Sequence, residues 1–247
     1  MDPFQIALIV LSALMLPLII WMIAVSVRVN TTFARYKRVA SASGKTAAQV
    51  AREILDANGL YTVDIRHTSG HLSDHYNPAD NCVYLSDSTY TSNSVSAIAV
   101  AAHEVGHAIQ YAENYAPVKL RAALVPAVNF TSRLSLPLLL LAMILEIFSY
   151  STGSVSYRLS NILLLLAVVC YGVYCLFTFI TLPTELNASS RAKKILREHE
   201  ILNEEECAQA SKVLHAAAMT YVASFVMSLW QMLRLLFVFL ARRNNNN

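Results

Sequence analysis

Two histidines and a glutamate lie within five residues of one another in a stretch that is otherwise apolar. Residues 99–111 read AVAAHEVGHAIQY, in which His103, Glu104 and His107 match the pattern HExxH. On a helix, side chains four residues apart project from one face about 5 to 6 Å apart, so both histidines can bind one zinc ion. Glu104 can then act as general base toward a water whose pKa zinc lowers toward about 7. The pattern predicts a hydrolytic zinc site.

Three fixed positions in five residues also arise by chance, so the alternative is a hydrogen-bonded structural cluster without a metal. The surrounding residues, about 93–113, suit a continuous helix. Burying two histidines and a glutamate among alanines is costly unless they have partners or a metal ion. This cost favours the metal site.

A catalytic zinc ion usually has three protein ligands and one open position, so a third ligand is required. Glu185, in the segment TLPTELNASSRA, is the predicted one, because two membrane crossings separate it from His107 and return the chain to the same side. A glutamate near a helix N-terminus is also favoured by the helix dipole alone, so residue type does not decide. The alternative ligands are Glu113, His67, His71, Asp74 and His75.

Several further side chains are candidates for supporting roles. His71, Asp74 and His75 cluster in a region expected to be extended, where they can orient the ligand histidines or lie on the surface. Together with Tyr84 they are also candidates for contacts with substrate. The transition-state oxyanion needs a donor besides zinc, for which the candidates are His71, His75, Tyr76, Tyr221 and Arg191.

The composition is typical of a membrane protein. Of the 247 residues, 55% are hydrophobic and only 14% are charged. Four stretches approach or exceed the roughly 20 apolar residues that a spanning helix needs, namely 4–27, 134–150, 160–182 and 219–240. The first has no basic residue before it and no small-residue cleavage site after it, so a retained anchor is expected. The four cysteines show no CxxC spacing, which argues against a disulfide framework and a thiolate metal site.

Lysine and arginine next to membrane helices indicate orientation, because basic segments favour the cytoplasmic side. They follow the first and third spans, as Arg28, Arg35, Lys37, Arg38, Arg191, Lys193, Lys194 and Arg197. The catalytic region is therefore expected at the cytoplasmic face of a bacterial inner membrane, although Arg242 and Arg243 after the fourth span oppose the rule. The net charge of +3 reflects this topology rather than nucleic-acid binding, since no nucleic-acid module accompanies it.

Helix and strand signals lie in the first polar region. Thr46 and Gln49 have capping-box spacing at the start of a helix that ends near Asn58. Residues 70–86 predict a hairpin or two short extended segments, because the turn-forming NPAD separates GHLSDHY from NCVYLS. NCVYLS is placed either to offer an edge to a substrate strand or to be an ordinary core strand.

Two helix starts are expected in the second polar region. Pro183 and Thr184 are start signals that directly follow the third span, and Asn203 with Glu206 three residues later is another. A helix starting at Pro183 would carry Glu185 in its first turn, at the membrane surface.

In combination these motifs resemble one family. A single N-terminal span, GHLSDHYNP, VYLS, AAHEVGHAIQ, TLPTELNASSRA and a hydrophobic C-terminal segment are similar to the YugP-like family of bacterial membrane zinc metallopeptidases over nearly the whole chain. The resemblance implies that the two histidines bind zinc, that Glu104 is catalytic and that Glu185 completes the site. The chain more distantly resembles HtpX-like and CAAX-processing membrane proteases, which commonly have an aspartate four residues after the ligand glutamate. Here that position is Ser189, so the orienting partner of the histidines stays unassigned.

The sequence therefore predicts a mainly α-helical membrane protein with about four transmembrane helices, a zincin-like HExxH catalytic region and a small β-hairpin or short sheet. Besides the four spans, the expected segments are a catalytic region over 28–133 and a helical segment over 183–218 with the third zinc ligand. The expected function is a zinc-dependent endopeptidase in the lipid bilayer that cleaves membrane-associated or misfolded polypeptides at the cytoplasmic face.

Two other functions compete with this one. A non-catalytic adaptor or chaperone-like membrane protein would keep a structural metal site but would not need Glu104 as a base. An intramembrane protease of the site-2 type places an aspartate ligand in a later membrane helix. No aspartate follows Asp87 in this chain, so its order of motifs is wrong for that type.

Overall fold

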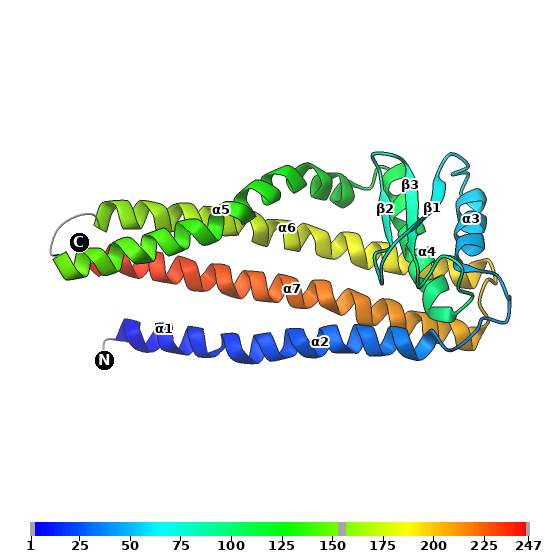
Figure 1. Cartoon of the computed structure of the whole chain (residues 1–247), viewed down its shortest axis with the longest axis horizontal. Coiled ribbons are helices and arrows are strands. Elements are labelled where there is room, and N and C mark those ends of the chain that lie inside the picture. Colours follow the sequence, from blue (N-terminus) through cyan, green and yellow to red (C-terminus); the bar gives the residue numbers. More distant parts are fainter. Residues whose placement is uncertain (1–2, 153–156, 246–247) are drawn as a thin grey trace. The chain divides into compact units, whose positions relative to one another are not determined.

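Long apolar helices make up most of the chain (Figure 1). The computed structural model describes residues 3–152 and 157–245. The elements in chain order are α1 (Pro3–Ala13), α2 (Met15–Tyr36), α3 (Ala47–Ala57), β1 (Asp64–Thr68), β2 (His75–Asn77), β3 (Cys82–Ser86), α4 (Val95–Ala112), α5 (Ala116–Thr152), α6 (Tyr157–Glu198) and α7 (Glu204–Asn245). They divide into a helical unit, Met1–Ile23, Leu120–Ile180 and Ala223–Asn247, and an α/β unit, Ala24–Lys119 and Thr181–Val222.

Four helical segments are long and apolar enough to cross a membrane, namely Ile9–Tyr36, Ala116–Leu145, Leu159–Glu198 and Glu204–Ala241. In the helical unit, large apolar side chains face outward, with Ile20 58%, Leu136 61% and Val169 56% exposed. Such extensive apolar exposure is unfavourable in water and favourable in lipid. The prediction of a mainly helical membrane protein with four apolar helices is confirmed.

Two polar contacts join helices inside the helical unit. The hydroxyls of Thr178 on α6 and Ser228 on α7 lie 2.7 Å apart, and the indole N–H of Trp230 donates to the carbonyl of Leu11 over 3.1 Å. An unpaired polar group costs several kcal/mol in hydrocarbon, roughly 2–7 by transfer data, so such pairs suit helices that meet within a bilayer.

The helix predicted to start at Pro183 does not start there, because α6 runs without a break from Tyr157 to Glu198. A proline removes one backbone N–H and disturbs one turn, but the helix continues where the residues around it are held by packing. Thr181, Thr184 and Glu185 are all buried around the proline. Glu185 is therefore carried on the interior of a long helix, which removes the explanation that it only caps a helix N-terminus.

Both predicted caps of the α/β unit are confirmed. At the start of α3, the backbone N–H of Gln49 donates to Thr46 Oγ1 over 3.3 Å, and Gln49 Oε1 accepts from the backbone N–H of Thr46 at 2.9 Å. At the start of α7, the Glu206 N–H donates to Asn203 Oδ1 over 2.9 Å, and Glu206 Oε2 accepts from the Asn203 N–H at 3.0 Å. Each pair satisfies two backbone groups that a helix end leaves unpaired.

The sheet has the strand order β1-β3-β2. The predicted hairpin is confirmed, since β2 pairs antiparallel with β3, and β1 adds to the other side of β3 in parallel. NCVYLS therefore supplies the central strand and not an edge, so its predicted role in binding a substrate strand is wrong. The physical reason is β1, whose mostly exposed, polar residues DIRHT gave no strand signal, yet which occupies the free edge of β3.

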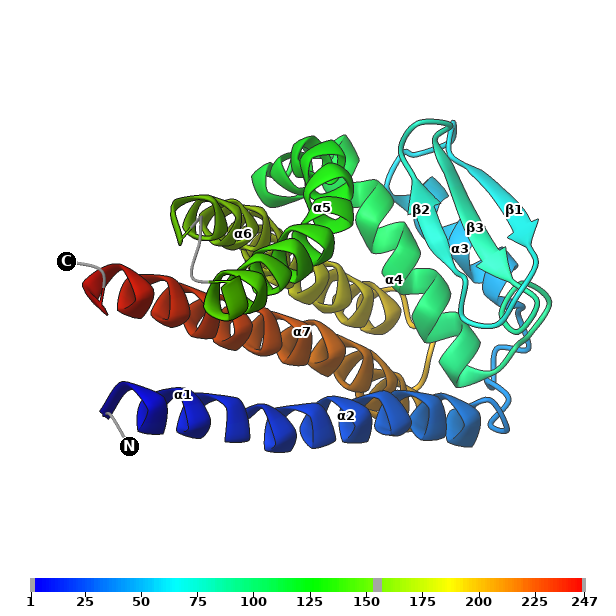
Figure 2. The same ribbon diagram turned by 60° about the vertical axis from the view of Figure 1, so that its left-hand side comes forward.

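α4 is the centre of the α/β unit. Its side chains are buried around most of its circumference, and it contacts α3, β2 and β3 (Figure 2). The same core takes in Phe33 from α2, Leu196 from α6 and Leu214 from α7. A polar residue on α4 is therefore surrounded by protein, which fixes its side chain against the neighbouring elements.

Candidate metal centre

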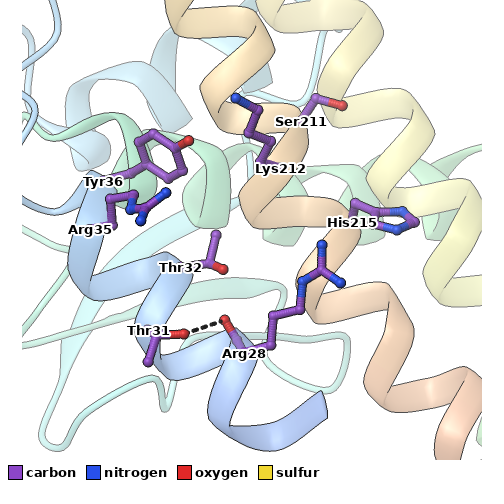
Figure 3. Close-up of a pocket in the computed structure, with 8 residues that line it drawn as sticks. All are labelled: Arg28, Thr31, Thr32, Arg35, Tyr36, Ser211, Lys212 and His215. Carbon is purple, nitrogen blue, oxygen red and sulfur yellow. Dashed lines mark hydrogen bonds between the residues drawn. The ribbon is translucent and has the colours of Figure 1, made fainter. Parts of the chain in front are cut away.

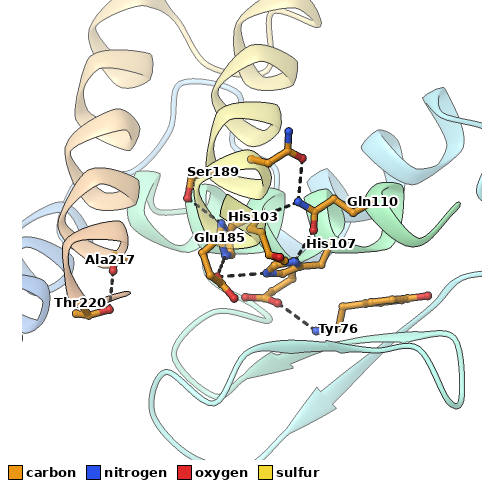
Figure 4. Close-up of polar contacts among 11 residues, drawn as sticks. Tyr76, His103, His107, Gln110, Glu185, Ser189, Ala217 and Thr220 are labelled. Carbon is orange, nitrogen blue, oxygen red and sulfur yellow. Dashed lines mark hydrogen bonds and ion pairs between the residues drawn. The ribbon is translucent and has the colours of Figure 1, made fainter. Parts of the chain in front are cut away.

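The structure brings three potential metal ligands together, His103 and His107 from α4 and Glu185 from α6 (Figure 4). The Nε2 atoms of His103 and His107 lie 3.2 and 3.5 Å from the same carboxylate oxygen, Glu185 Oε2. One ligand atom from each residue lies within 4.8 Å of the others, and this is the only such group among the described residues.

The geometry of the group fits zinc. Ligand atoms about 2.0–2.2 Å from one zinc ion at tetrahedral angles lie about 3.3–3.6 Å apart. The two histidine–glutamate separations, 3.2 and 3.5 Å, are close to this spacing. Two imidazoles and one carboxylate are also the donor set that catalytic zinc uses when it keeps a fourth position open.

Burial makes the group electrostatically suited to a cation. Glu185 is 2% exposed and His107 is 8% exposed. Burial alone would lower the pKa of His107, but the hydrogen bond and negative charge of Glu185 outweigh it and hold this pKa above its ordinary value. A carboxylate that attracts protons onto neighbouring imidazoles attracts a metal cation by the same charge.

Each of the two histidines also has a hydrogen-bond partner at its Nδ1 atom. His103 Nδ1 lies 3.1 Å from Ser189 Oγ, and His107 Nδ1 lies 2.9 Å from Gln110 Oε1. Both contacts suit an Nδ1–H donor, which leaves the Nε2 lone pair of each ring for a metal. Ser189 thus supplies the partner of His103 that the sequence left unassigned.

Gln110 links α4 to α6. Its side chain is completely buried, and its amide nitrogen donates to the Thr184 carbonyl over 2.8 Å and to Asn187 Oδ1 over 2.9 Å. The amide oxygen is then held in place to accept from His107. Gln110 lies in the apolar stretch around the HExxH motif, and no role was predicted for it. Its position one turn after His107 was the available signal.

The hydrogen bonds that start at His107 and Gln110 continue from Asn187 to the surface through Arg191 and Glu113. Asn187 Oδ1 accepts from Arg191 Nε at 2.8 Å, and Arg191 pairs with the Glu113 carboxylate at 2.6 Å. The hydrogen bond from Arg191 lowers the pKa of Glu113 below its ordinary value. Glu113, an alternative third ligand, is thus engaged outside the metal group, and Arg191, an oxyanion candidate, is engaged in positioning Asn187.

The side chain of Glu104 extends from α4 to the sheet. It is 9% exposed, and its Oε2 accepts a hydrogen bond of 3.1 Å from the backbone N–H of Tyr76 in β2. Tyr76 is paired in register with Val83 of β3, yet it donates away from that strand. The peptide group of Tyr76 therefore faces the open edge of β2, next to the HExxH helix.

The other predicted site residues are placed elsewhere in the α/β unit. His67 pairs with Asp87, and the ring of His71 lies 5.7 Å from that of Phe33. Asp74 accepts from the backbone and hydroxyl of Ser86, whereas His75 stacks on Tyr84, with ring centroids 4.9 Å apart. In the described part of the chain no hydrogen bond joins His71, Asp74, His75 or Tyr84 to His103 or His107. A substrate contact for these four stays a prediction.

Gly106, inside the HExxH motif, allows α4 and α6 to approach closely. A Cβ at this position would lie 2.9 Å from the carbonyl oxygen of Ala188 and 3.4 Å from its carbonyl carbon. The obstacle is backbone, so it cannot be relieved by a rotamer change. Ala188 is three residues after Glu185, and the close approach therefore sets how near the glutamate comes to the histidines.

Gly106→Ala is expected to destabilise the protein by about 1–3 kcal/mol, because α6 must shift to accommodate the methyl group. Its zinc affinity should fall in parallel, since Glu185 moves with Ala188. Thermal unfolding in detergent and zinc titration measure both. Gly172→Ala is the matched control, because its Cβ would meet only Met232 Sδ at 3.9 Å. Wild-type stability and zinc affinity in Gly106→Ala would refute the close-approach argument.

Ser189→Ala is expected to weaken zinc binding about ten-fold, since loss of a hydrogen-bond partner of a ligand histidine typically costs about 10–100-fold. Competition with a chromogenic chelator measures the affinity. The neighbouring Ser190 is exposed and supplies the control Ser190→Ala. Equal affinities in the two variants would show that Ser189 does not orient His103.

Fold and site together define a class of protein, a helical membrane protein in which an HExxH helix meets a glutamate from a later helix in a zinc-type site. The chain belongs to the family described as "Putative neutral zinc metallopeptidase", whose model matches residues 11–240. It is 42% identical over 219 residues to the "Putative membrane protease YugP" of Bacillus subtilis (strain 168), covering 89% of this chain and 92% of that protein. No solved structure matches significantly. The predicted family resemblance is confirmed.

Proposed function

We propose that this protein is a zinc-dependent endopeptidase in which His103, His107 and Glu185 hold the metal. One observation carries the proposal: the Nε2 atoms of both HExxH histidines lie 3.2 and 3.5 Å from one carboxylate oxygen of α6. Membership of a zinc metallopeptidase family supports the same assignment. Glu104, on the same helix as the two histidines, is the proposed general base.

The chemistry divides between the metal and the chain. A zinc ion in this site would lower the pKa of a water to about 7 and polarise the scissile carbonyl. Glu104 accepts the proton of the attacking water and returns it to the leaving amine nitrogen. Its Oε2 accepts from Tyr76, so Oε1 is the oxygen offered to the water. Ser189 and Gln110 keep both imidazoles in the orientation that ligation requires.

The open edge of β2 is the proposed place for the substrate strand. An extended peptide that adds to a sheet edge is held by backbone hydrogen bonds at fixed spacing. The Tyr76 N–H points to this edge and now donates to Glu104 Oε2, so a substrate carbonyl would accept this hydrogen bond in place of that oxygen. This assignment replaces the central strand β3, whose two sides are both paired.

The proposed substrates are polypeptides near the membrane, either membrane proteins or misfolded chains. Four apolar helices tie the site to a bilayer, which restricts it to substrates that reach the surface. The basic residues after the first and third spans favour the cytoplasmic face of the inner membrane.

The substitution Glu104→Gln tests this proposal, because it removes the proposed base and leaves the proposed metal ligands in place. A non-catalytic adaptor with a structural metal site would be insensitive to the same change. The experiment therefore distinguishes an enzyme from an adaptor.

A further inference from the structure

A cavity in the α/β unit lies between the end of α2 and the first half of α7 (Figure 3). Its volume is ≈ 570 Å³, and the lining residues with charged or hydroxyl groups include Arg28, Thr32, Arg35, Ser211, Lys212 and His215. None of these belongs to the metal centre. The cavity is therefore a separate feature that needs its own explanation.

The lining of this cavity is strongly cationic. Arg28, Arg35 and Lys212 carry full positive charges, and no acidic residue lines the cavity. Within the described parts of the chain, none of these three cations forms a salt bridge, whereas Arg52 and Arg191 in the same unit each pair with a carboxylate. Cations that gather without counter-charges are stabilised by an anionic ligand.

The spacing of the lining residues suits a phosphate group. Arg28, Thr32 and Arg35 are four and three residues apart, so they share one face of α2, and Ser211 and His215 share one face of α7. Guanidinium groups bind phosphate oxygens in pairs of parallel hydrogen bonds, and hydroxyls add further donors. Thr31 contributes less, because its hydroxyl already donates to the Val27 carbonyl over 2.9 Å.

The cavity also lies where two apolar helical segments become polar. Residues 3–27 carry no charge, and Arg28 is the first charged residue after them. On α7, residues 216–233 carry no charge, and His215 and Lys212 directly precede them. Both helices are candidate membrane spans, so this level is where lipid headgroups are expected.

We propose that this cavity binds the phosphate-bearing headgroup of an anionic phospholipid. The arginines hold the phosphate, and the hydroxyls and Lys212 complete its contacts. Basic pockets between membrane helices are a recurrent form of headgroup site. The inference is independent of the proposed peptidase activity, because no residue of the metal centre takes part in it.

Native mass spectrometry of the full chain in a non-ionic detergent tests the proposal, with phosphatidylglycerol and phosphatidylcholine as probes. Phosphatidylglycerol is expected to bind more tightly. Arg28→Gln should weaken its binding about five-fold and Arg28→Gln/Arg35→Gln about 25-fold, as expected for single basic residues near an anionic lipid. Both arginines are exposed, so these variants should fold normally.

The matched control is Arg38→Gln, which removes another exposed arginine that does not line the cavity. It should leave phosphatidylglycerol binding unchanged. An equal loss in Arg38→Gln would show diffuse attraction and overturn the proposal, as would equal binding of phosphatidylcholine. Displacement of the lipid by millimolar glycerol 3-phosphate would identify a free phosphate site and overturn the assignment to a lipid.

Discussion

Replacing Glu104 with glutamine is expected to abolish peptide cleavage while leaving the zinc content unchanged. General base catalysis contributes about 10²–10⁴-fold, and glutamine cannot accept the proton of the attacking water. The substitution preserves size and keeps an oxygen that can accept from the Tyr76 N–H, so the local structure should survive. Cleavage of a fluorescently labelled unfolded polypeptide by the detergent-purified protein measures activity, and elemental mass spectrometry measures zinc.

Glu113→Gln is the matched control for this experiment. Glu113 follows α4 directly and pairs with Arg191 at the surface. Glutamine keeps an oxygen that can accept from Arg191, so the control changes a glutamate near the same helix and leaves the hydrogen bonds behind His107 in place. It should cleave at close to the wild-type rate. Full cleavage by Glu104→Gln would exclude it as the base. Absence of cleavage by the wild-type, zinc-loaded protein would favour the adaptor.

Replacing Glu185 with alanine is expected to remove bound zinc from the purified protein. The wild-type chain should hold about one zinc ion, and the variant should hold less than about one tenth of that, because two histidines alone leave the tetrahedral site incomplete. His103→Ala should have the same effect. Elemental mass spectrometry against protein concentration gives the ratio.

Glu185→Gln is the control for misfolding of the alanine variant. It keeps the volume of a side chain that is 2% exposed and removes only its charge. Glu113→Ala tests the alternative ligand and should retain zinc. Zinc at full occupancy in both Glu185 variants would show that Glu185 is not the third ligand. His71 and Asp74 would then be the first alternatives to test. A folded protein without zinc in both variants would support the proposed site.

The local sequence was sufficient to predict the features that depend on residues close together in the chain. The spacing of His103 and His107 places both rings on one helical face whatever the rest of the fold does. The caps at Thr46 and Asn203 likewise depend on side chains three residues away, and both formed as predicted. The four apolar helices followed from length and composition, because a bilayer imposes the same requirement on every spanning segment.

Only the tertiary structure decided which distant groups meet. Glu185 is 82 residues from His103, and its selection over Glu113 and His71 depends on how α6 packs on α4. The close approach at Gly106 and the cross-link through Gln110 set that packing. Neither contact leaves a periodic pattern in the sequence.

Two predictions failed for the same physical reason. The start signal at Pro183 was overridden by the burial of its neighbours on α6, and the free edge of NCVYLS was occupied by β1. Propensity acts within a few residues, whereas packing and strand pairing act between segments that the chain brings together only on folding. The sequence by itself therefore determined the HExxH pattern, the caps and the apolar helices. The tertiary structure determined the third potential ligand, the partners that orient both histidines and the open edge of the sheet.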